Sequence, residues 1–317
     1  MEDVTANNIF DGCLIKESNN LESWMSLLSP SLKKLPIIQL AIPGSHNSMT
    51  YTIMPENDIG PDEPAYIRML GCICTFAAKP IIFNWSITQD STIIQQLNGG
   101  VRYLDLRVAT KSASNDFYFL HGLYGEKINK SLEDILNWLN HHPNEIIILD
   151  FQHFYSFSHY DHEKLIKLIT NMFHGKLCPV YETFNHITLE WLSSLKNQII
   201  LIYRDINARN HAYFWPNNFW PTPWPNTTST DRLIAFLSNN LRSKNDNLGF
   251  VSQCLLTPNF PYVLKHLCGN LRKSLVRSCQ TPIYTWINEQ CPGKFGMNIV
   301  IAGFYIGKEL FILQKYY

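Results

Sequence analysis

The chain lacks an excess of charge of either sign. Its 317 residues carry 26 Lys and Arg against 26 Asp and Glu, so the formal net charge is zero. Without a basic surplus or a polybasic segment, the sequence offers no general means of holding a nucleic-acid backbone or of adhering tightly to anionic lipid. We therefore expect no nucleic-acid partner.

Long apolar runs are also missing. No run reaches the roughly 18 residues that a membrane-spanning helix needs, so we expect no membrane span. The first eight residues are acidic and polar, and they do not have the pattern of a signal peptide.

Cysteine is present, but not in a pattern typical of structural disulfide bonds or of a metal site. The eight cysteines are scattered, and the one close pair, Cys72 and Cys74, has no second pair that would complete a zinc site. Free thiols are expected in a chain of this size without a leader. These features predict a cytoplasmic protein without a zinc site, and nothing in them calls for a cofactor.

Hydrophobic residues make up 45% of the chain, and they fall into alternating strand and helix patterns. Strands are predicted at 35–42, 101–108, 117–121, 145–151, 198–204, 249–256 and 298–304. Helices are predicted at 65–76, 91–98, 131–142, 161–173, 189–195, 231–241, 262–277 and 283–289, with Ser131 as a helix cap. Such alternation implies parallel strands joined by crossovers, hence an α/β fold. No repeat or linker divides the chain, so a single main domain at 35–317 is expected, with residues 1–34 packing on its outside through a short helix near Trp24.

Polar side chains gather at the C-terminal ends of the predicted strands. These are Asp105, Arg107, His121, Asp150, Gln152, Arg204 and Gln253. A closed α/β barrel has its active site at the C-terminal end of its strands, and an open doubly wound sheet also binds ligands at that end. The pattern of residues leaves both architectures open.

His46 lies just beyond the strand predicted at 35–42, in the stretch Ala41–Ser48. Pro43 and Gly44 are expected to end that strand with a turn. The turn would hold the histidine at the mouth of a site rather than in the hydrophobic core. An imidazole there titrates near neutral pH.

Asp105 and Arg107 share one face of a predicted strand with Tyr103. An acid and an arginine on an inner face need a partner or a ligand. They form either a structural ion pair or an anion site in which Arg107 grips a phosphate and Asp105 orients it.

His121 ends another apolar strand and is followed by glycine. Taken alone it is a structural histidine. Paired with His46 across Arg107, it becomes an acid/base partner, because two imidazoles and one arginine suffice for in-line cleavage of a phosphodiester.

These three motifs together resemble the phosphatidylinositol-specific phospholipase C X domain, over roughly residues 35–305, and in particular the X-domain-only proteins of animals. The resemblance implies a TIM-like (β/α) barrel and a phosphoric diester hydrolase of phospholipase C type that acts on a phosphoinositide headgroup. By analogy His46 is the general base and His121 the general acid, with Arg107 and Asp105 in the catalytic group.

The resemblance also bears on metal dependence. Calcium-dependent members have an acidic residue where this chain has Arg107, and bacterial members have arginine, which implies a calcium-free mechanism. Asn47 is the residue found in calcium-dependent enzymes, where it contacts the metal. We give Arg107 more weight, since a fixed positive charge disfavours a hard divalent ion, and we expect Asn47 to contact substrate.

Further substrate contacts are implied by weaker matches. Arg204 resembles an inositol-binding arginine, although a surface turn with Asp205 is an alternative. Asp150 and Gln152 lie near a ligand-contacting position, and Gln253 is expected to line the site.

The segment 213–224 contains Trp215, Trp220 and Trp224 among prolines. Tryptophan favours membrane interfaces, so one interpretation is a rim loop that makes transient contact with a membrane surface. Packing of the aromatics within a long loop is the alternative.

One departure from the family pattern concerns the last strand. The family's sequence Ala-Asp-Phe supplies an aspartate to the general base, whereas this chain has Gly303. Either Asp105 or Asp150 substitutes, or activity is weak. The rival hypotheses are therefore a catalytically weak or inactive lipid-binding scaffold, and a barrel phosphodiesterase of the glycerophosphodiester class, which would need acidic metal ligands that are not evident here.

Overall fold

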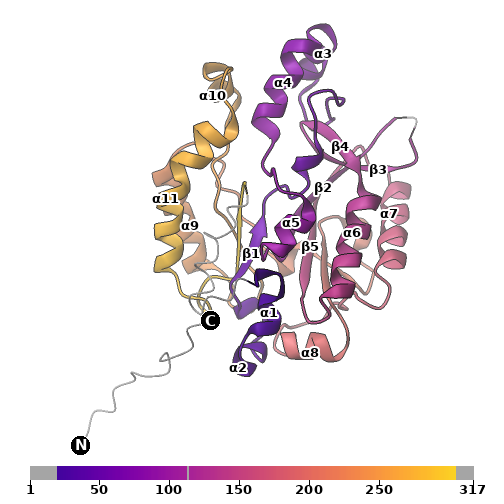
Figure 1. Cartoon of the computed structure of the whole chain (residues 1–317), viewed down its shortest axis with the longest axis vertical. Coiled ribbons are helices and arrows are strands. Elements are labelled where there is room, and N and C mark those ends of the chain that lie inside the picture. The colour runs from indigo at the N-terminus through magenta and orange to yellow at the C-terminus, as the bar shows by residue number, and fades with distance from the viewer. Residues whose placement is uncertain (1–19, 113, 305–317) are drawn as a thin grey trace, which may run out of the picture.

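A curved parallel sheet forms the centre of the computed structural model, which describes residues 20–112 and 114–304 (Figure 1). Its strands follow the order β7 (Phe214–Trp215), β6 (Ile199–Tyr203), β5 (Ile147–Tyr155), β2 (Tyr103–Thr110), β1 (Ile42–Ser45), β9 (Ile299–Ala302) and β8 (Val251–Gln253). An antiparallel hairpin of β3 (Phe117–His121) and β4 (Leu123–Lys127) extends from β2. The α/β barrel-like fold expected from the resemblance is confirmed.

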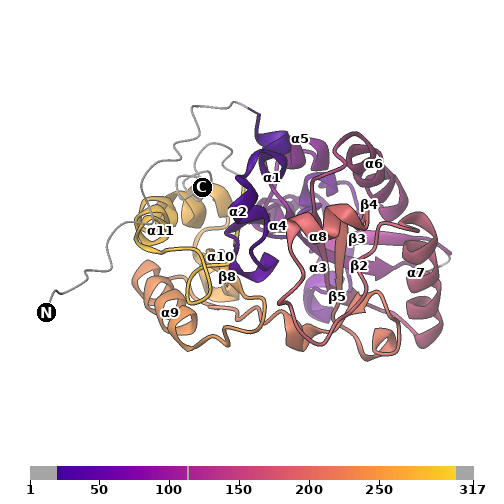
Figure 2. The ribbon, with the colours of Figure 1, turned by 90° about the horizontal axis from the view of Figure 1, so that it is seen from below.

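Helices surround the outer face of the sheet (Figure 2). They are α5 (Ile93–Asn98), α6 (Ile128–His141), α7 (His159–Met172), α9 (Thr230–Ser243) and α11 (Arg277–Glu289), whereas α8 (Leu189–Ser194) lies across the end of the barrel away from the strand C-termini (Figure 1). The amphipathic pattern of α6 explains its position, because Leu132, Ile135 and Leu139 are fully buried and pack in one cluster with the outward side chains of β2 and β5.

Period-two alternation sends the other side chains of each strand inward. On β5, Leu149 belongs to the cluster under the helices, whereas Ile148 belongs to the cluster inside the barrel. On β2, Tyr103 is inside and Leu104 is outside. Alternate residues further along the same strands therefore point inward, which is what brings Asp105 and Asp150 to the interior near the C-terminal end.

The barrel is closed between β7 and β8 by irregular backbone rather than by a strand pair. The backbone N–H groups of Gly249 and Val251 donate to the carbonyl oxygens of Phe219 and Pro221, both at 3.0 Å. Trp220 packs so closely on Gly249 that a Cβ there would lie 2.0 Å from the indole ring. Prolines lack the N–H that a regular strand needs, so this segment closes the barrel without forming a ladder.

This closure corrects the prediction of membrane contact through Trp215 and Trp220. Both side chains are fully buried, and the Trp215 ring stacks on Phe184 with centroids 5.0 Å apart. Trp224 is 54% exposed and donates a hydrogen bond to the Thr257 hydroxyl. Of the two interpretations of this segment, internal packing is therefore right for Trp215 and Trp220.

The N-terminal helices α1 (Trp24–Leu27) and α2 (Pro30–Lys33) pack at the opposite end of the barrel from the strand C-termini (Figure 2). Trp24 is buried and donates to the Gly100 carbonyl at 2.9 Å. A fully buried ion pair of Arg102 and Glu145, 2.7 Å apart, anchors this end, and Glu145 also accepts from the backbone of Ser26 at 2.8 Å. The rest of the predicted N-terminal segment, residues 1–19, lies outside the described residues, as do 305–317.

The first strand differs from its prediction. The stretch 35–42 forms a 3₁₀ turn at Ile37–Gln39, and β1 begins only at Ile42, so Pro43 and Gly44 lie inside the strand instead of ending it. A Cβ at residue 44 would meet the side chains of Ile301 and Tyr103 at 2.7–3.0 Å. The glycine is required by the close approach of neighbouring strands, rather than by a turn.

Helix boundaries also differ from their predictions. Helix α6 begins at Ile128, so Ser131 is buried within the helix and is not its cap. The helix expected at 65–76 is two helices, α3 (Ala65–Ile73) and α4 (Thr75–Ser86). The helix expected at 262–277 is divided into α10 (Phe260–Lys265) and a π-helical turn, Arg272–Val276, which leads into α11.

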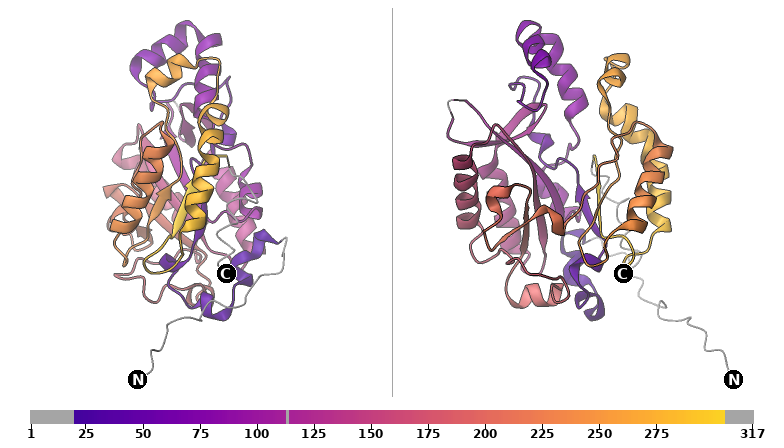
Figure 3. Two further views of the ribbon diagram at one scale, coloured as in Figure 1. Left: turned by 90° about the vertical axis from the view of Figure 1, so that its left-hand side faces the viewer. Right: turned by 180° about the vertical axis from the view of Figure 1, so that it is seen from behind.

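Two helical projections, which we call the arms, rise from the end of the barrel where the strands terminate (Figures 1 and 3). The first arm is residues 65–86, formed by α3 and α4, and the second is 260–276, containing α10. Their tips approach each other, because the rings of Tyr66 and Phe260 lie 5.8 Å apart. Within the residues described, no helix has the length and apolar character needed to cross a membrane.

Candidate active site

His46 lies at the C-terminal end of β1 in a turn that is held from several sides. Its backbone N–H donates to the Ala302 carbonyl at 3.0 Å, and its own carbonyl accepts from Thr88 Oγ1 and Gln89 Nε2, each at 3.0 Å. Asn47 follows with a positive φ of 44°, a conformation that asparagine tolerates better than most residues. The imidazole is therefore fixed at the mouth of the barrel, as predicted from its place after a strand.

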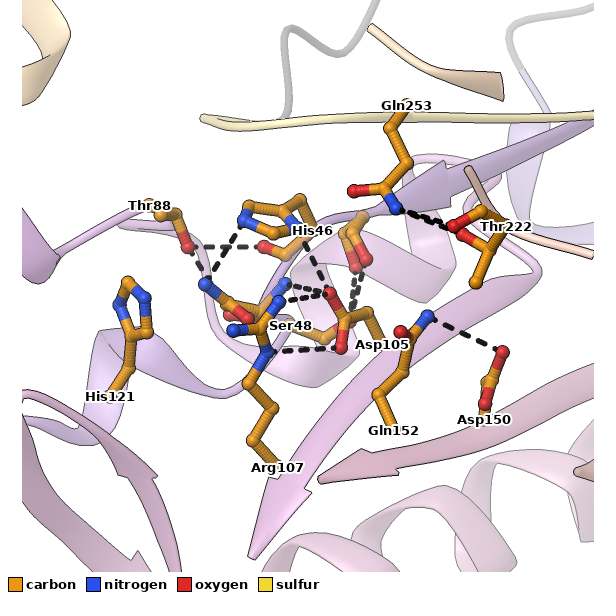
Figure 4. A network of polar contacts seen from close by, with 12 residues as sticks. His46, Ser48, Thr88, Asp105, Arg107, His121, Asp150, Gln152, Thr222 and Gln253 are labelled. Carbon is orange, nitrogen blue, oxygen red and sulfur yellow. Dashed lines mark hydrogen bonds and ion pairs between the residues drawn. The ribbon is translucent and has the colours of Figure 1, made fainter. Parts of the chain in front are cut away.

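Asp105 on β2 orients this imidazole (Figure 4). Its Oδ2 lies 2.9 Å from His46 Nδ1 and also accepts from the Asn47 backbone N–H at 3.1 Å. Burial lowers the pKa of His46, and the Asp105 carboxylate opposes that effect. Of the two acids that the sequence left open as partners for His46, the structure brings Asp105 to it.

Arg107 lies beside Asp105 on the same face of β2, as the period of the strand predicted. Its Nε and Nη2 are each 3.5 Å from a carboxylate oxygen of Asp105, a loose pairing that leaves the guanidinium able to bind an anion. Burial by itself raises the pKa of Asp105, but Arg107, His46 and the Asn47 amide outweigh burial and hold that pKa well below its usual range. Asp105 is therefore a carboxylate at neutral pH.

His121 at the end of β3 faces His46, with ring centroids 6.5 Å apart and planes at 80°. Its Nδ1 lies 2.6 Å from the Ser86 carbonyl, so Nδ1 carries a proton and Nε2 is left for a ligand. Burial and the nearby Arg107 lower the pKa of His121 to about 3. The two imidazoles and the guanidinium thus converge on one place, as the sequence predicted.

The glycine that follows His121 is required by this geometry. Gly122 has φ +68°, and a Cβ there would lie 2.3 Å from Ser86 Oγ, the residue whose carbonyl holds the His121 ring. The Gly122 N–H donates to Asp62 Oδ2 at 2.7 Å.

Asp150, Arg204 and Gln152 form a second polar group beside the first, because Asp150 on β5 lies in register with Asp105 on β2. Arg204 binds Asp150 in a bidentate manner, with Nε–Oδ1 at 2.8 Å and Nη2–Oδ2 at 2.6 Å, which rules out the alternative of a surface turn with Asp205. Tyr103 donates to Asp150 at 2.5 Å, and Gln152 donates to the Tyr103 hydroxyl at 2.9 Å. Much of the hydrogen-bonding capacity of these residues is therefore used within the group.

The remaining predicted contacts lie on either side of the site. Gln253 at the end of β8 donates to the Thr222 carbonyl and hydroxyl at 3.1 and 3.0 Å, so it fastens the segment that closes the barrel. Asn47 Nδ2 lies 3.1 Å from His46 Nε2, while its Oδ1 is buried and has no partner among the described residues.

Calcium does not suit this donor set. Calcium takes about six to eight oxygen ligands. The oxygens of Asp105 already face His46, Arg107 and the Asn47 amide, and across residues 20–112 and 114–304 no group of three or more His, Cys, Asp or Glu side chains is placed to hold a metal.

Sequence reasoning missed the residues that support the two histidines. Ser86 accepts from the His121 ring, and Thr88 and Gln89 donate to the His46 carbonyl, although Ser86 is the last residue of α4 and the other two come from the irregular stretch after it. Tyr155 on β5, beside Arg107, was also missed. A strand pattern could have placed Tyr155 near the site, but nothing local marks the other three.

Gly303 lies at the wall of the site, near His46. A Cβ at that position would meet only the Thr88 carbonyl oxygen at 3.6 Å and the Thr88 Cβ at 3.9 Å, so the position has room for a side chain. Because Asp105 already contacts His46 Nδ1, the histidine keeps a carboxylate partner in spite of this glycine.

The fold is the one seen in solved structures of bacterial phosphatidylinositol-specific phospholipases C. The solved structure of the enzyme from Listeria monocytogenes matches with a TM-score of 0.65 at 17% identity and covers 94% of this chain and 99% of that one. A structure of the phosphatidylinositol-specific phospholipase C of Staphylococcus aureus matches with a TM-score of 0.63, also at 17% identity, over 93% of this chain and 98% of that one. Likeness at this level of identity establishes the fold.

Sequence comparison narrows the class to a family. The model of the phosphatidylinositol-specific phospholipase C, X domain, matches residues 83–205. The mouse PI-PLC X domain-containing protein 3 is 34% identical over 292 residues, 91% of either chain. Human PI-PLC X domain-containing protein 2 is 39% identical over 258 residues, 80% of this chain and 84% of its own, and human protein 1 is 34% identical over 315 residues, 98% and 95%. The chain belongs to the family of PI-PLC X domain-containing proteins, which confirms the resemblance.

Proposed function

We propose that this protein is a phosphoric diester hydrolase of phospholipase C type that cleaves a phosphoinositide headgroup. The observation that carries the proposal is the convergence of His46 and His121, 6.5 Å apart, beside Arg107. Family membership supports the substrate class, and the geometry supports the reaction.

In the proposed reaction, His46 Nε2 takes the proton from the inositol hydroxyl next to the phosphate, while Asp105 holds Nδ1. That oxygen forms a bond to phosphorus as the bond from phosphorus to the glycerol oxygen breaks. His121 gives its Nε2 proton to the departing oxygen, and Arg107 stabilises the charge that develops on phosphorus. The products are a cyclic inositol phosphate and diacylglycerol.

The low pKa of His121 in the free protein is compatible with this role. Burial and Arg107 both disfavour the imidazolium, which is why the pKa falls to about 3. A phosphodiester bound against Arg107 adds a negative charge beside the ring and offsets the guanidinium. Substrate binding therefore raises the pKa of His121 and loads it with the proton that the leaving oxygen needs.

We further propose that the reaction needs no calcium, because Arg107 supplies the positive charge beside Asp105. Asn47 supports substrate binding in this scheme, since its buried Oδ1 has no partner among the described residues and can accept a bond from an inositol hydroxyl. In this scheme Arg204, Asp150, Gln152 and Gln253 act mainly by tying together the strands and the closing segment around the site.

Membrane contact is proposed to occur through the arms instead of the tryptophan segment. The arm tips expose large apolar side chains, among them Ile73 at 72% and Phe76 at 86% on the first arm, and Phe260 and Leu264 on the second. The mouth of the site opens between these tips, so a protein lying on a bilayer by its arms would face the lipid headgroups.

The second candidate function is a lipid-binding scaffold with weak or no activity, which Gly303 favours because the family's aspartate is missing. Release of inositol phosphate from phosphatidylinositol vesicles, with and without a chelator, separates the two. Hydrolysis that resists chelator and disappears in His46→Ala and His121→Ala supports the hydrolase without calcium. Loss of hydrolysis with chelator overturns the calcium-free mechanism, and vesicle binding without any hydrolysis supports the scaffold.

A further inference from the structure

A cleft of about 530 Å³ runs from the two histidines outward between the arms. Its walls are apolar on both sides. The first arm contributes Ile67, Ala78 and Ile81, and the second arm together with α11 contributes Val263, Leu271 and Ile283. Ligand-binding clefts in proteins span about 300–1,000 Å³, so this one is large enough for a substantial part of a substrate.

The position of the cleft relative to the chemistry decides which part of the substrate it can take. His46 and His121 both lie at its base, whereas Arg107 and Asp105 are not among its lining residues. The cleft therefore reaches both histidines, including the one that protonates the leaving oxygen in the proposed reaction, and it extends away from the guanidinium. Whatever is bonded to that leaving oxygen points into the cleft.

The chemistry of the walls decides what kind of group this is. Beyond the histidine pair, the ionisable carboxyl on the lining is Glu63, and burial raises its pKa to about 7, so it carries only part of a charge at neutral pH. Cys254 and Cys279 are buried thiols that stay protonated, because burial raises the pKa of Cys279 to about 11 and that of Cys254 further. Such walls favour hydrocarbon and disfavour a headgroup or a glycerol hydroxyl.

We propose that this cleft takes the acyl chains of the lipid substrate, so that the hydrocarbon lies within the protein while the phosphodiester is cleaved. The inference rests on the proposed function for the position of the leaving oxygen. A diacyl lipid matches each part of the cleft. Its polar ester oxygens lie at the histidines and its acyl chains lie along the apolar walls, up to the far end of the cleft at the exposed arm tips. The preferred substrate is then a phosphoinositide with intact chains, and glycerophosphoinositol is a poor one.

The first test measures cleavage of water-soluble phosphatidylinositols that differ only in acyl length, from glycerophosphoinositol to dihexanoyl-phosphatidylinositol, below their critical micelle concentrations. Each methylene that enters the cleft raises kcat/KM by about fourfold. Ala78→Trp fills the cleft from α4 and abolishes this dependence. Ala77→Trp places the same side chain at the neighbouring exposed position, which is not on the lining, and keeps it.

The second test is independent of hydrolysis. Calorimetry measures binding of dihexanoylglycerol, which contains no phosphate, to wild type, Ala78→Trp and Ala77→Trp. We expect saturable binding to wild type and Ala77→Trp, and at least tenfold weaker binding to Ala78→Trp. Val263→Trp blocks the cleft from the opposite arm, so misfolding of one variant, seen by thermal unfolding, leaves the test intact.

The outcomes separate the inference from the proposed function. Hydrolysis with equal kcat/KM for every acyl length overturns the assignment of the cleft to acyl chains but supports the proposed hydrolase activity. Binding of dihexanoylglycerol without any hydrolysis overturns the hydrolase and leaves the cleft assigned to hydrocarbon. Sedimentation that shows dihexanoylglycerol dissociating a dimer would assign the cleft to a second copy of the chain and overturn the inference.

Discussion

Asp105→Asn tests the catalytic geometry most directly. In the wild type the carboxylate faces His46 Nδ1 at 2.9 Å and accepts the Asn47 backbone N–H at 3.1 Å. An amide of the same shape removes the negative charge and offers either an oxygen or an NH₂ group to the imidazole. The amide contacts can reverse the tautomer of His46, which would put its proton on the nitrogen that has to act as the base.

The size of the effect follows from two independent arguments. At an effective dielectric constant of about 20, unit charges about 4 Å apart interact by about 4 kcal/mol, which the imidazolium formed during reaction would lose. Since about 1.4 kcal/mol corresponds to a tenfold change, the rate falls by about 10³. Loss of the correct tautomer in a carboxylate–histidine pair costs about 10⁴ in kcat elsewhere. We expect kcat to fall by about 10³–10⁴ with little change in KM.

The assay is release of inositol phosphate by purified wild type and variant. Asp134→Asn on α6 is the matched control, because among the described residues Asp134 pairs only with the exposed Lys130, at 3.2 Å, and it should retain wild-type kcat. Thermal unfolding checks that both variants are folded. An Asp105→Asn protein that keeps more than about a tenth of wild-type kcat would refute the role given to this carboxylate.

Three further predictions follow from the same structure. The kcat/KM profile should have its optimum below pH 6.5, since burial lowers the pKa of both histidines below the ordinary value of 6.5 and the reaction needs His46 neutral and His121 protonated. The kcat profile should be displaced to higher pH, because bound phosphate raises the pKa of His121. An optimum of kcat/KM above pH 7 would contradict this prediction. Gly303→Asp should not raise kcat in the vesicle assay, because Asp105 already holds His46 Nδ1, and a clear increase would mean that the pairing with Asp105 is insufficient. Trp220→Ala should lower the free energy of unfolding, measured in urea, by about 3–5 kcal/mol, since the fully buried ring packs where the barrel closes. Trp224→Ala, at an exposed position with one hydrogen bond, should lower it by about 1 kcal/mol. Equal effects of the two variants would argue against closure of the barrel by this segment.

The sequence by itself determined the class of fold and most of the residues of the proposed catalytic group. Apolar strands alternating with helices require parallel strands, and polar residues at the strand ends collect at one end of the barrel. The period of two places Asp105 and Arg107 on one face of β2 without reference to any other part of the chain. Motif spelling then identified the family, and with it the roles expected of His46 and His121.

Only the tertiary structure decided which groups meet. His46 pairs with Asp105 and Arg204 with Asp150 because strands far apart in the sequence lie in a particular order and register, which no local pattern encodes. The same holds for Trp215 and Trp220: an amphipathic ring among prolines suits a membrane or a barrel seam equally, and the choice depends on whether another surface covers it. The apolar cleft exists only because two separate helical arms rise side by side, so its walls come from segments whose patterns look like ordinary buried helices.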